Sequence, residues 1–241
     1  MQISLRIRNF VSLVRSGKFR YLASYYLDRI RVHPATAAYT VALDVRYARR
    51  LLGGDLPSRF GRLGAQAVHH TSYAILDLIF AVAEPRTNDV LVDVGCGKGR
   101  VVIYWLHRNY GRRIVGLEID PDIAARTARQ FRRFPNVEII AGDAIINIPD
   151  DGTFFYLYNP FTEEKVVEFE SRIAALPFRG QIRVIYYNPN FLEVFRTDRW
   201  ARRVVQLNGM LDRGTLKRFC FPVAILDRIH AVAGDGSDER R

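Results

Sequence analysis

Apolar residues in this chain fall into two alternating patterns. Short apolar runs, typical of buried strands, occupy 89–94, 113–118, 137–141, 153–158 and 181–187. Stretches with the helical period of 3.6 residues occupy 72–83, 99–109, 121–132, 162–175 and 190–196. Strands that alternate with helices require right-handed crossovers, so the pattern predicts an α/β fold with a parallel sheet.

The two ends of the chain depart from this alternation. Two further apolar runs, 202–207 and 215–223, are separated only by the turn around Gly209 and Gly214, which predicts a hairpin. Before the first strand, helix-period stretches at 2–15, 18–32 and 36–52 end at a Gly- and Pro-containing break at 53–58.

We therefore predict three parts. They are a helical N-terminal extension at 1–62, one main domain at 63–232, and a polar, disordered tail at 233–241. The 241 residues with 49% hydrophobic content suffice for one complete core.

Charge distinguishes the extension from the domain. The chain carries a net charge of +11, and residues 1–62 hold twelve Arg or Lys against three acids, which leaves +9. Three interpretations follow: a helical cap or substrate lid packed on the domain, contact through 1–50 with an anionic membrane surface or acidic partner, and nucleic-acid binding. Nucleic acid is the least favoured, because no recognised nucleic-acid module is visible.

The first strand leads into a glycine-rich turn. Glycines occupy positions 95, 97 and 99, and an apolar helix begins directly afterwards. Such a turn lets backbone N–H groups approach a ligand. The dinucleotide fingerprint would require a third glycine at Arg100, which disfavours a nicotinamide oxidoreductase. The phosphate-binding loop is excluded too, because Gly99 follows Lys98.

Polar residues follow each later strand in turn. Glu118 lies 23 residues after Gly95, where a carboxylate can accept hydrogen bonds from both hydroxyls of a ribose. Gly142-Asp143-Ala144 follows the third strand, and Tyr158-Asn159-Pro160-Phe161 follows the fourth. Simpler interpretations stay open: Glu118 as a surface acid, and the other two segments as plain turns.

Taken in order, these segments resemble the class I S-adenosylmethionine-dependent methyltransferases over roughly residues 65–222. The likeness is nearest to the protein-lysine type of N-methyltransferase. It implies a Rossmann-like, doubly wound, mostly parallel seven-stranded sheet whose last strand inserts antiparallel. It also implies S-adenosyl-L-methionine as the cofactor.

The resemblance further implies a set of cofactor-binding residues. It implies Asp93 near the cofactor's amino group, Gly95, Cys96 and Gly97 along its methionine part, Glu118 and Ile119 at the ribose, Asp143 and Ala144 at the adenine, Asn159 beside the methyl group, and Tyr73 at the end of a short cofactor-touching segment.

The acceptor site is implied with less detail. Amino-methylating members often carry Asn or Asp, two prolines and an aromatic, whereas this chain has one proline, at 160. By this likeness Asn159 and Tyr158 would orient a nitrogen acceptor on a protein side chain or a small molecule. Two alternatives remain: an O-methyltransferase acting on a sugar or metabolite, and a catalytically idle cofactor-binding scaffold.

Other site classes find little support. His69 and His70 have no further ligands at metal-binding spacing, so no metal site is expected. Two cysteines, Cys96 and Cys220, do not make a disulfide framework and indicate a reducing compartment. We expect a cytoplasmic protein without a spanning segment, with peripheral membrane contact as an alternative for the extension.

Overall fold

The computed structural model describes residues 34–53, 59–60, 70–177, 180–207 and 221–229. The helices predicted at 2–15 and 18–32 and the predicted tail at 233–241 lie outside these ranges.

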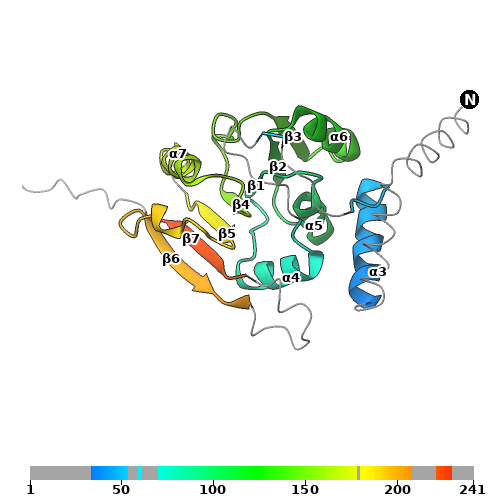
Figure 1. Cartoon of the computed structure of the whole chain (residues 1–241), viewed down its shortest axis with the longest axis horizontal. Coiled ribbons are helices and arrows are strands. Elements are labelled where there is room, and N and C mark those ends of the chain that lie inside the picture. The colour runs from blue at the N-terminus through cyan, green and yellow to red at the C-terminus, as the bar shows by residue number, and fades with distance from the viewer. Residues whose placement is uncertain (1–33, 54–58, 61–69, 178–179, 208–220, 230–241) are drawn as a thin grey trace, which may run out of the picture.

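A seven-stranded sheet with the order β3-β2-β1-β4-β5-β7-β6 forms the centre of the molecule (Figure 1). Its strands are β1 (Val90–Val94), β2 (Arg113–Glu118), β3 (Val137–Ala141), β4 (Phe154–Leu157), β5 (Arg183–Tyr187), β6 (Trp200–Val205) and β7 (Val223–Arg228). The first five pair in parallel, and β7 is inserted antiparallel between β5 and β6. The predicted fold class, including the antiparallel last strand, is confirmed.

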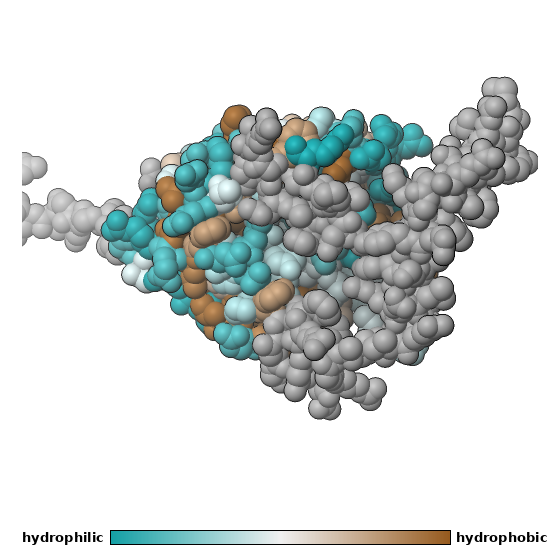
Figure 2. Space-filling view, viewed as in Figure 1, coloured by the Kyte–Doolittle hydropathy of each residue, from teal (hydrophilic) through white to brown (hydrophobic). Residues whose placement is uncertain are grey.

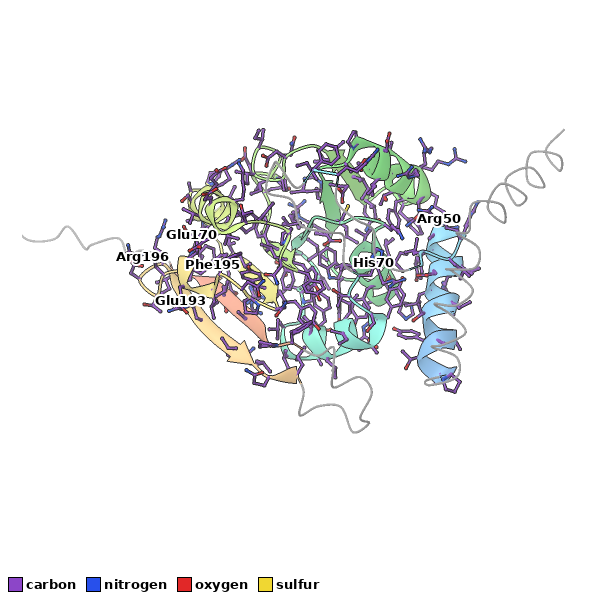
Figure 3. All side chains as sticks on the ribbon, in the orientation of Figure 1. Arg50, His70, Glu170, Glu193, Phe195 and Arg196 are labelled. Carbon is purple, nitrogen blue, oxygen red and sulfur yellow. The ribbon has the colours of Figure 1, made fainter. Side chains whose placement is uncertain are left out.

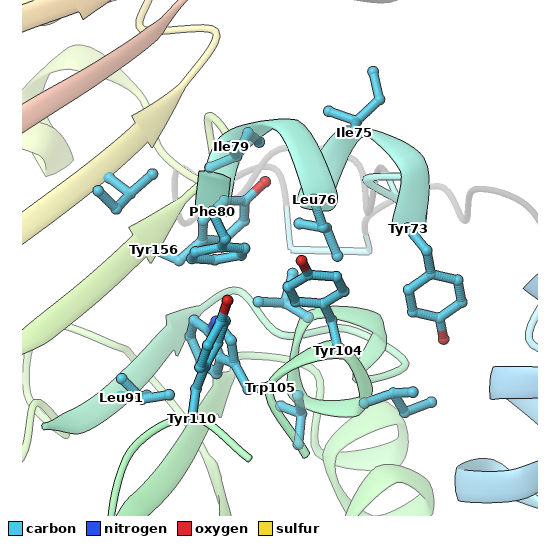
Figure 4. Packing of buried hydrophobic residues seen from close by; sticks show 14 of the residues in the cluster. Tyr73, Ile75, Leu76, Ile79, Phe80, Leu91, Tyr104, Trp105, Tyr110 and Tyr156 are labelled. Carbon is cyan, nitrogen blue, oxygen red and sulfur yellow. The ribbon is translucent and has the colours of Figure 1, made fainter. Parts of the chain in front are cut away.

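Helices cover both faces of the sheet. They are α3 (Pro34–Leu43), continued by a π-helical turn η1 (Asp44–Ala48), then α4 (Tyr73–Val82), α5 (Arg100–Arg108), α6 (Pro121–Phe131) and α7 (Glu163–Ala174). On one face, Phe80 of α4 stacks on Tyr104 of α5 with ring centroids 5.3 Å apart (Figure 4). On the other face, Phe169 and Ile173 of α7 join a second apolar cluster. The sheet is therefore buried on both sides, as continuous apolar strands require.

Two predicted elements differ from the structure. The stretch 190–196 forms only a three-residue 3-10 turn, η3 (Leu192–Val194), because the short connection to β6 is pinned by the buried ring of Phe195 against Trp200, 5.6 Å away. The hairpin between β6 and β7 is present, but β7 begins at Val223, where the predicted run ends. Residues 208–220 lie outside the described ranges.

The described part of the N-terminal extension packs on the domain. Leu43, Tyr47 and Leu52 belong to the same apolar cluster as α4 and α5. Residues 34–53 thus contribute to the main core rather than standing apart from it. None of the helices that the structure describes combines the length and apolarity needed to cross a membrane.

Candidate functional site

The glycine turn, residues 95–99, connects β1 to α5 and is held by its neighbours. All three of its glycines have φ between +53° and +81°, a region that favours glycine. The amides of Gly95 and Cys96 both donate to the carbonyl of Leu117 on β2, at 2.9 and 2.8 Å. A Cβ on Gly95 would lie 3.2 Å from the Cβ of Pro160, so the turn also borders the end of β4.

The side chain of Cys96 lies beneath this turn. A Cβ on Gly116 would approach the Cys96 sulfur to 2.8 Å, so the thiol fills the space that this glycine leaves. Burial, and then the charges of Asp93 and Glu118, raise the pKa of the Cys96 thiol well above its usual value. The thiol is therefore neutral, and Cys96 can offer a ligand only its backbone.

Asp93 supplies a buried carboxyl group at the end of β1. Its side chain is almost fully buried, and Oδ2 has no hydrogen-bond partner among the described residues. Burial, and secondarily the charge of Glu118, raise its pKa to about 8. Since buried carboxyl oxygens are normally paired, this one fits a cationic group of a ligand.

The strand beside Asp93 carries a hydroxyl group that is paired with a second one. Tyr156 is the β4 partner of Asp93 in the sheet register, and its hydroxyl is hydrogen-bonded to the hydroxyl of Thr71 at 2.7 Å. Burial raises the pKa of Tyr156 well above its usual value, so this hydroxyl stays protonated.

Glu118 is fixed by backbone amides at the end of β2. Oε2 accepts from the amide of Gly97 at 2.8 Å, and Oε1 accepts from the amide of Asp120 at 2.9 Å. Burial raises its pKa although both hydrogen bonds oppose the shift. Its side chain is buried, so the surface-acid interpretation does not hold. Each oxygen retains a lone pair for a ligand hydroxyl. Ile119, the next residue, is partly exposed.

Thr127 of α6 is a supporting residue that the sequence reasoning missed. Its fully buried hydroxyl donates to the carbonyl of Gly97 at 2.8 Å. A Cβ on Gly99 would lie 3.2 Å from the Thr127 methyl group and 2.5 Å from the ring of Phe131. The sequence feature that indicates Thr127 is its position as a single polar residue on the apolar face of the helix predicted at 121–132.

Asp143 ends β3 in a turn that is tied to Glu118. The amide of Gly142 donates to the backbone carbonyl of Glu118 at 2.9 Å. Oδ1 of Asp143 accepts from the amide of Ile145 at 2.8 Å, while Oδ2 lies 3.9 Å from the ammonium group of Lys165. The Asp143 side chain is one-third exposed, and Ala144 is buried beside it. Asp143 thus forms the turn and also keeps an accessible carboxylate.

Asn159 joins the ends of β4 and β5. Its side-chain amide donates to the carbonyl of Asn188 at 2.6 Å, and its Oδ1 accepts from the amide of Asn190 at 3.3 Å. Both Asn159 and Asn188 have positive φ, at 42° and 52°. The residue holds two strand-end turns together, and each of its polar atoms has capacity for one more hydrogen bond.

Tyr158 is the aromatic residue at this edge of the sheet. Its ring lies 4.7 Å from that of Tyr187 on β5 and 6.5 Å from that of Phe221. Phe161, the aromatic residue after Pro160, packs on Phe169 of α7, 5.8 Å away.

Tyr73 belongs to a buried polar cluster behind the glycine turn. Its hydroxyl donates to Oδ1 of Asp44 at 2.8 Å, and the Arg100 guanidinium carbon lies 5.5 Å from the centre of its ring. Oδ2 of Asp44 accepts from the amide of Leu52 at 3.1 Å and lies 3.5 Å from Arg100. In Figure 4 the Tyr73 side chain points away from the stacked rings of α4 and α5. Asp44 was also missed, although it is a single acid within an apolar stretch.

The end of the extension contacts the surroundings of the glycine turn. The Lys98 ammonium group donates to the carbonyl of Leu52 at 2.8 Å. Further along, the Arg59 guanidinium binds Asp120 at 2.7 Å and Asp122 at 2.9 Å at the start of α6. Burial alone would raise the pKa of Asp120, but the hydrogen bonds from Arg59 and from the first amides of α6 bring this pKa below its usual value.

Metal ligands are not gathered at this site. Within the ranges that the structure describes, no group of three or more His, Cys, Asp or Glu side chains is arranged to hold an ion. His69 lies outside those ranges, and His70 is partly buried.

Known proteins resemble this chain in sequence. Residues 91–166 match the model of a family described as a methyltransferase domain. A probable cobalt-precorrin-6B C(15)-methyltransferase (decarboxylating) of Methanothermobacter thermautotrophicus is 36% identical over 86 residues, which are 33% of this chain and 44% of that protein. A probable ribosomal RNA small subunit methyltransferase A of Methanopyrus kandleri is 24% identical over 157 residues, 61% of this chain and 54% of that protein. The chain thus spans about half the length of these relatives.

Solved structures share the fold. An RNA methyltransferase from Salinibacter ruber, crystallised with S-adenosyl-L-homocysteine, has a TM-score of 0.51 at 23% identity, covering 71% of this chain and 100% of that one. A precorrin 8W decarboxylase from Methanobacterium thermoautotrophicum has a TM-score of 0.50 at 25% identity, covering 68% of this chain and 93% of that one.

Proposed function

We propose that this chain, a class I S-adenosylmethionine-dependent methyltransferase, transfers the methyl group to a nitrogen atom of a protein side chain or small molecule. The observation that carries the proposal is the pair of buried carboxyl groups, Asp93 and Glu118, on either side of the glycine turn. Asp93 has an oxygen without a hydrogen-bond partner among the described residues, and each oxygen of Glu118 has a lone pair left for a ligand.

These residues fit S-adenosyl-L-methionine. Asp93 would hold its amino group, the backbone of residues 95–97 would lie along its methionine part, and Glu118 with Ile119 would bind the ribose. Asp143 and the backbone of Ala144 would bind the adenine. When bound, the cofactor supplies a methyl group on a sulfonium, which is already an activated leaving group.

Because the methyl group is already activated, the protein residues need only orient the acceptor and exclude water. Tyr158 presents an aromatic face at the edge where β4 and β5 end. Asn159 fixes the turn at 188–190 and has one N–H and one lone pair left for an acceptor amine. We propose these two residues as the acceptor-orienting pair.

We also propose that the extension, residues 1–62, caps the domain, residues 63–232. Support comes from Leu52, which accepts a hydrogen bond from Lys98, and from Arg59, which binds the first turn of α6. Contact of residues 1–50 with an anionic membrane surface or acidic partner is the alternative role for this part.

Calorimetric titration of the full chain with S-adenosylmethionine tests the site. Glu118→Ala and Gly97→Arg are each expected to weaken binding by at least about tenfold, because the first removes a charged acceptor and the second places a side chain in the turn. The control is Glu193→Ala, an exposed glutamate far from the turn. Unchanged affinity in both site variants would contradict the assignment.

A nitrogen of an RNA base is a second candidate acceptor. Support comes from the relative named as a ribosomal RNA methyltransferase and from exposed arginines on α6. Labelled S-adenosylmethionine with fractionated lysate, read by mass spectrometry, distinguishes the acceptors. Label on oxygen would favour the O-methyltransferase alternative. Cofactor binding without release of S-adenosylhomocysteine in any fraction would favour the idle scaffold.

A further inference from the structure

We infer that an exposed arginine surface on η1, on α6 and on the residues that directly follow each of them binds the phosphate backbone of RNA, an inference that rests on the RNA candidate of the proposed function. The arginine surface consists of Arg46, Arg49, Arg50, Arg126, Arg129 and Arg132, all of which are exposed. The α6 region, at the upper right of Figure 2, is covered mostly by hydrophilic residues.

The two segments that form this surface are joined by direct contacts. Arg133, at the end of α6, donates to the carbonyls of Arg46 and Tyr47. Nε of Arg50 donates to the side-chain oxygen of Gln130 at 3.4 Å, and the ring of Tyr47 stacks on Phe134 at 6.0 Å. Arg50 accordingly lies between α6 and the top of α3 in Figure 3. Arginines about 80 positions apart in sequence therefore share one side of the molecule.

The positive charge of this surface is not neutralised by the described residues. Within the ranges that the structure covers, no ion pair joins any of the six arginines to a carboxylate. Asp120 and Asp122, at the start of α6, are bound by Arg59. The charge of Asp44 acts on Arg50, but Asp44 lies 3.5 Å from Arg100. The guanidinium group of Arg50, just after η1, is close enough to that of Arg126 on α6 for the charge of Arg126 to act on it. Two guanidinium groups thus repel each other across the contact between η1 and α6.

The chemistry of the surface favours a phosphodiester backbone. Arginine presents a planar fork that matches phosphate oxygens, and a row of such groups gains affinity by releasing counterions. Arg126 and Arg129 are three positions apart on α6 and are therefore neighbours on its surface, so the positive charge is concentrated there. A membrane-bound helix would also need an exposed apolar face, whereas Ile123 and Phe131 of α6 are buried. Val45 and Leu51 are exposed beside the surface, so a membrane is the alternative outcome of the test.

The surface is connected to the candidate cofactor site. The side-chain amide of Gln130 donates to the carbonyl of Lys98 within the glycine turn at 3.1 Å. Arg50 is therefore two hydrogen bonds from the turn. RNA held along α6 would be anchored next to the cofactor end of the sheet.

Fluorescence anisotropy of a labelled 20-nucleotide RNA hairpin with the full chain, from 50 to 200 mM salt, tests the inference. Arg126→Gln/Arg129→Gln is expected to bind about tenfold more weakly, with the log–log salt slope reduced by about 1.8, or about 0.9 per lost phosphate contact to a duplex stem. The matched control is Arg112→Gln/Arg196→Gln, two exposed arginines that each pair with an aspartate elsewhere. The control is expected to bind as the parent does.

Three results would overturn the inference: no RNA binding by the parent chain, equal losses in both double variants, or loss of binding to phosphatidylserine vesicles alone. The last result would assign the surface to a membrane. Calorimetry with S-adenosylmethionine on the same variants separates this test from that of the proposed function. Full cofactor affinity with no RNA binding would contradict only the RNA-binding role of the arginine surface. RNA binding without cofactor affinity would contradict only the assignment of the cofactor site.

Discussion

Three acidic residues at successive strand ends occupy different environments. Asp93 is buried with one unpartnered oxygen, Glu118 is buried but accepts two backbone hydrogen bonds, and Asp143 is one-third exposed. The surroundings of Asp93 suit a cationic group of a ligand, and those of Glu118 suit a pair of ligand hydroxyl groups. The surroundings of Asp143 suit an amino group that can reach the surface. The type of each residue was visible in the sequence, but its environment depends on neighbours from other strands.

Asp93 predicts a pH dependence of stability. Its pKa of about 8 in the folded chain lies above the ordinary carboxyl value, so the folded chain binds a proton that the unfolded chain has lost. The contribution of Asp93 is complete below about pH 4 and is lost as the pH rises through about 8. Urea unfolding from pH 5 to 8.5 is expected to show this decline, and Asp93→Asn is expected to reduce it.

The cofactor provides a control for this prediction. A bound cation compensates the ionised Asp93, so saturating S-adenosylmethionine is expected to flatten the decline in the parent chain and to have little effect on it in Asp93→Asn. The same decline in both proteins without cofactor would show that another group controls it.

At the scale of elements, local signals predicted helix starts well. The helix predicted at 121–132 begins after Asp120-Pro121, a typical helix start, and Oδ1 of Asp120 accepts from the amides of Asp122 and Ile123, at 2.9 and 3.2 Å. Such caps depend on residues within one turn, which a sequence displays directly. The salt bridge from Arg59 to the same carboxylate joins positions 61 residues apart and could not be read in that way.

Two substitutions of Asp120 distinguish the contribution of the helix cap to stability from that of the ion pair with Arg59. Asp120→Ala is expected to lower the free energy of unfolding by about 1 to 2 kcal/mol, because it removes both. Asp120→Asn keeps a capping oxygen and is expected to cost less than about 1 kcal/mol, since the Arg59 side chain is 60% exposed and water screens the pair. Urea denaturation measures the free energy of unfolding of both variants. Equal losses in the two would show that the helix cap and the ion pair do not contribute separately.

Other elements depended on distant contacts. The stretch 190–196 has apolar residues at helical spacing, yet it forms only a 3-10 turn because Phe195 is buried against Trp200. Asn159-Pro160 is a common turn signal, and nothing local indicates that the Asn159 amide binds the turn after β5. Propensity and periodicity do not contain such tertiary contacts.

At the scale of the whole molecule, charge and packing describe different properties of the N-terminal extension. The basic composition of residues 1–62 distinguishes them from the rest, but the arginines that the structure describes in this segment are exposed and do not indicate how it packs. The apolar residues of the same segment, Leu43, Tyr47 and Leu52, enter the main core, and Asp44 is buried with Arg100. The end of the extension is thus an integral part of the domain.

Truncation tests the roles of the extension. Removing residues 1–33 leaves the packed segment intact and is expected to preserve cofactor affinity. Removing residues 1–50 deletes the core residues Leu43 and Tyr47 together with Asp44, and the loss of Asp44 alone, which leaves Arg100 buried without this carboxylate, is expected to cost about 3 to 5 kcal/mol of stability. Calorimetry and urea denaturation measure the two effects. Co-sedimentation with anionic vesicles, compared between the full chain and the shorter truncation, tests membrane contact, and identical sedimentation would contradict it.

The insertion of β7 has a consequence for synthesis on the ribosome. The six other strands of the described sheet emerge before β7, yet β7 is the only neighbour of β6 and covers the edge of β5. Until Arg228 has left the exit tunnel, the nascent sheet has an open edge, of the kind that promotes pairing between chains. A translation pause after β6 would therefore prolong the aggregation-prone stage, and a chain terminated before residue 223 would remain in it.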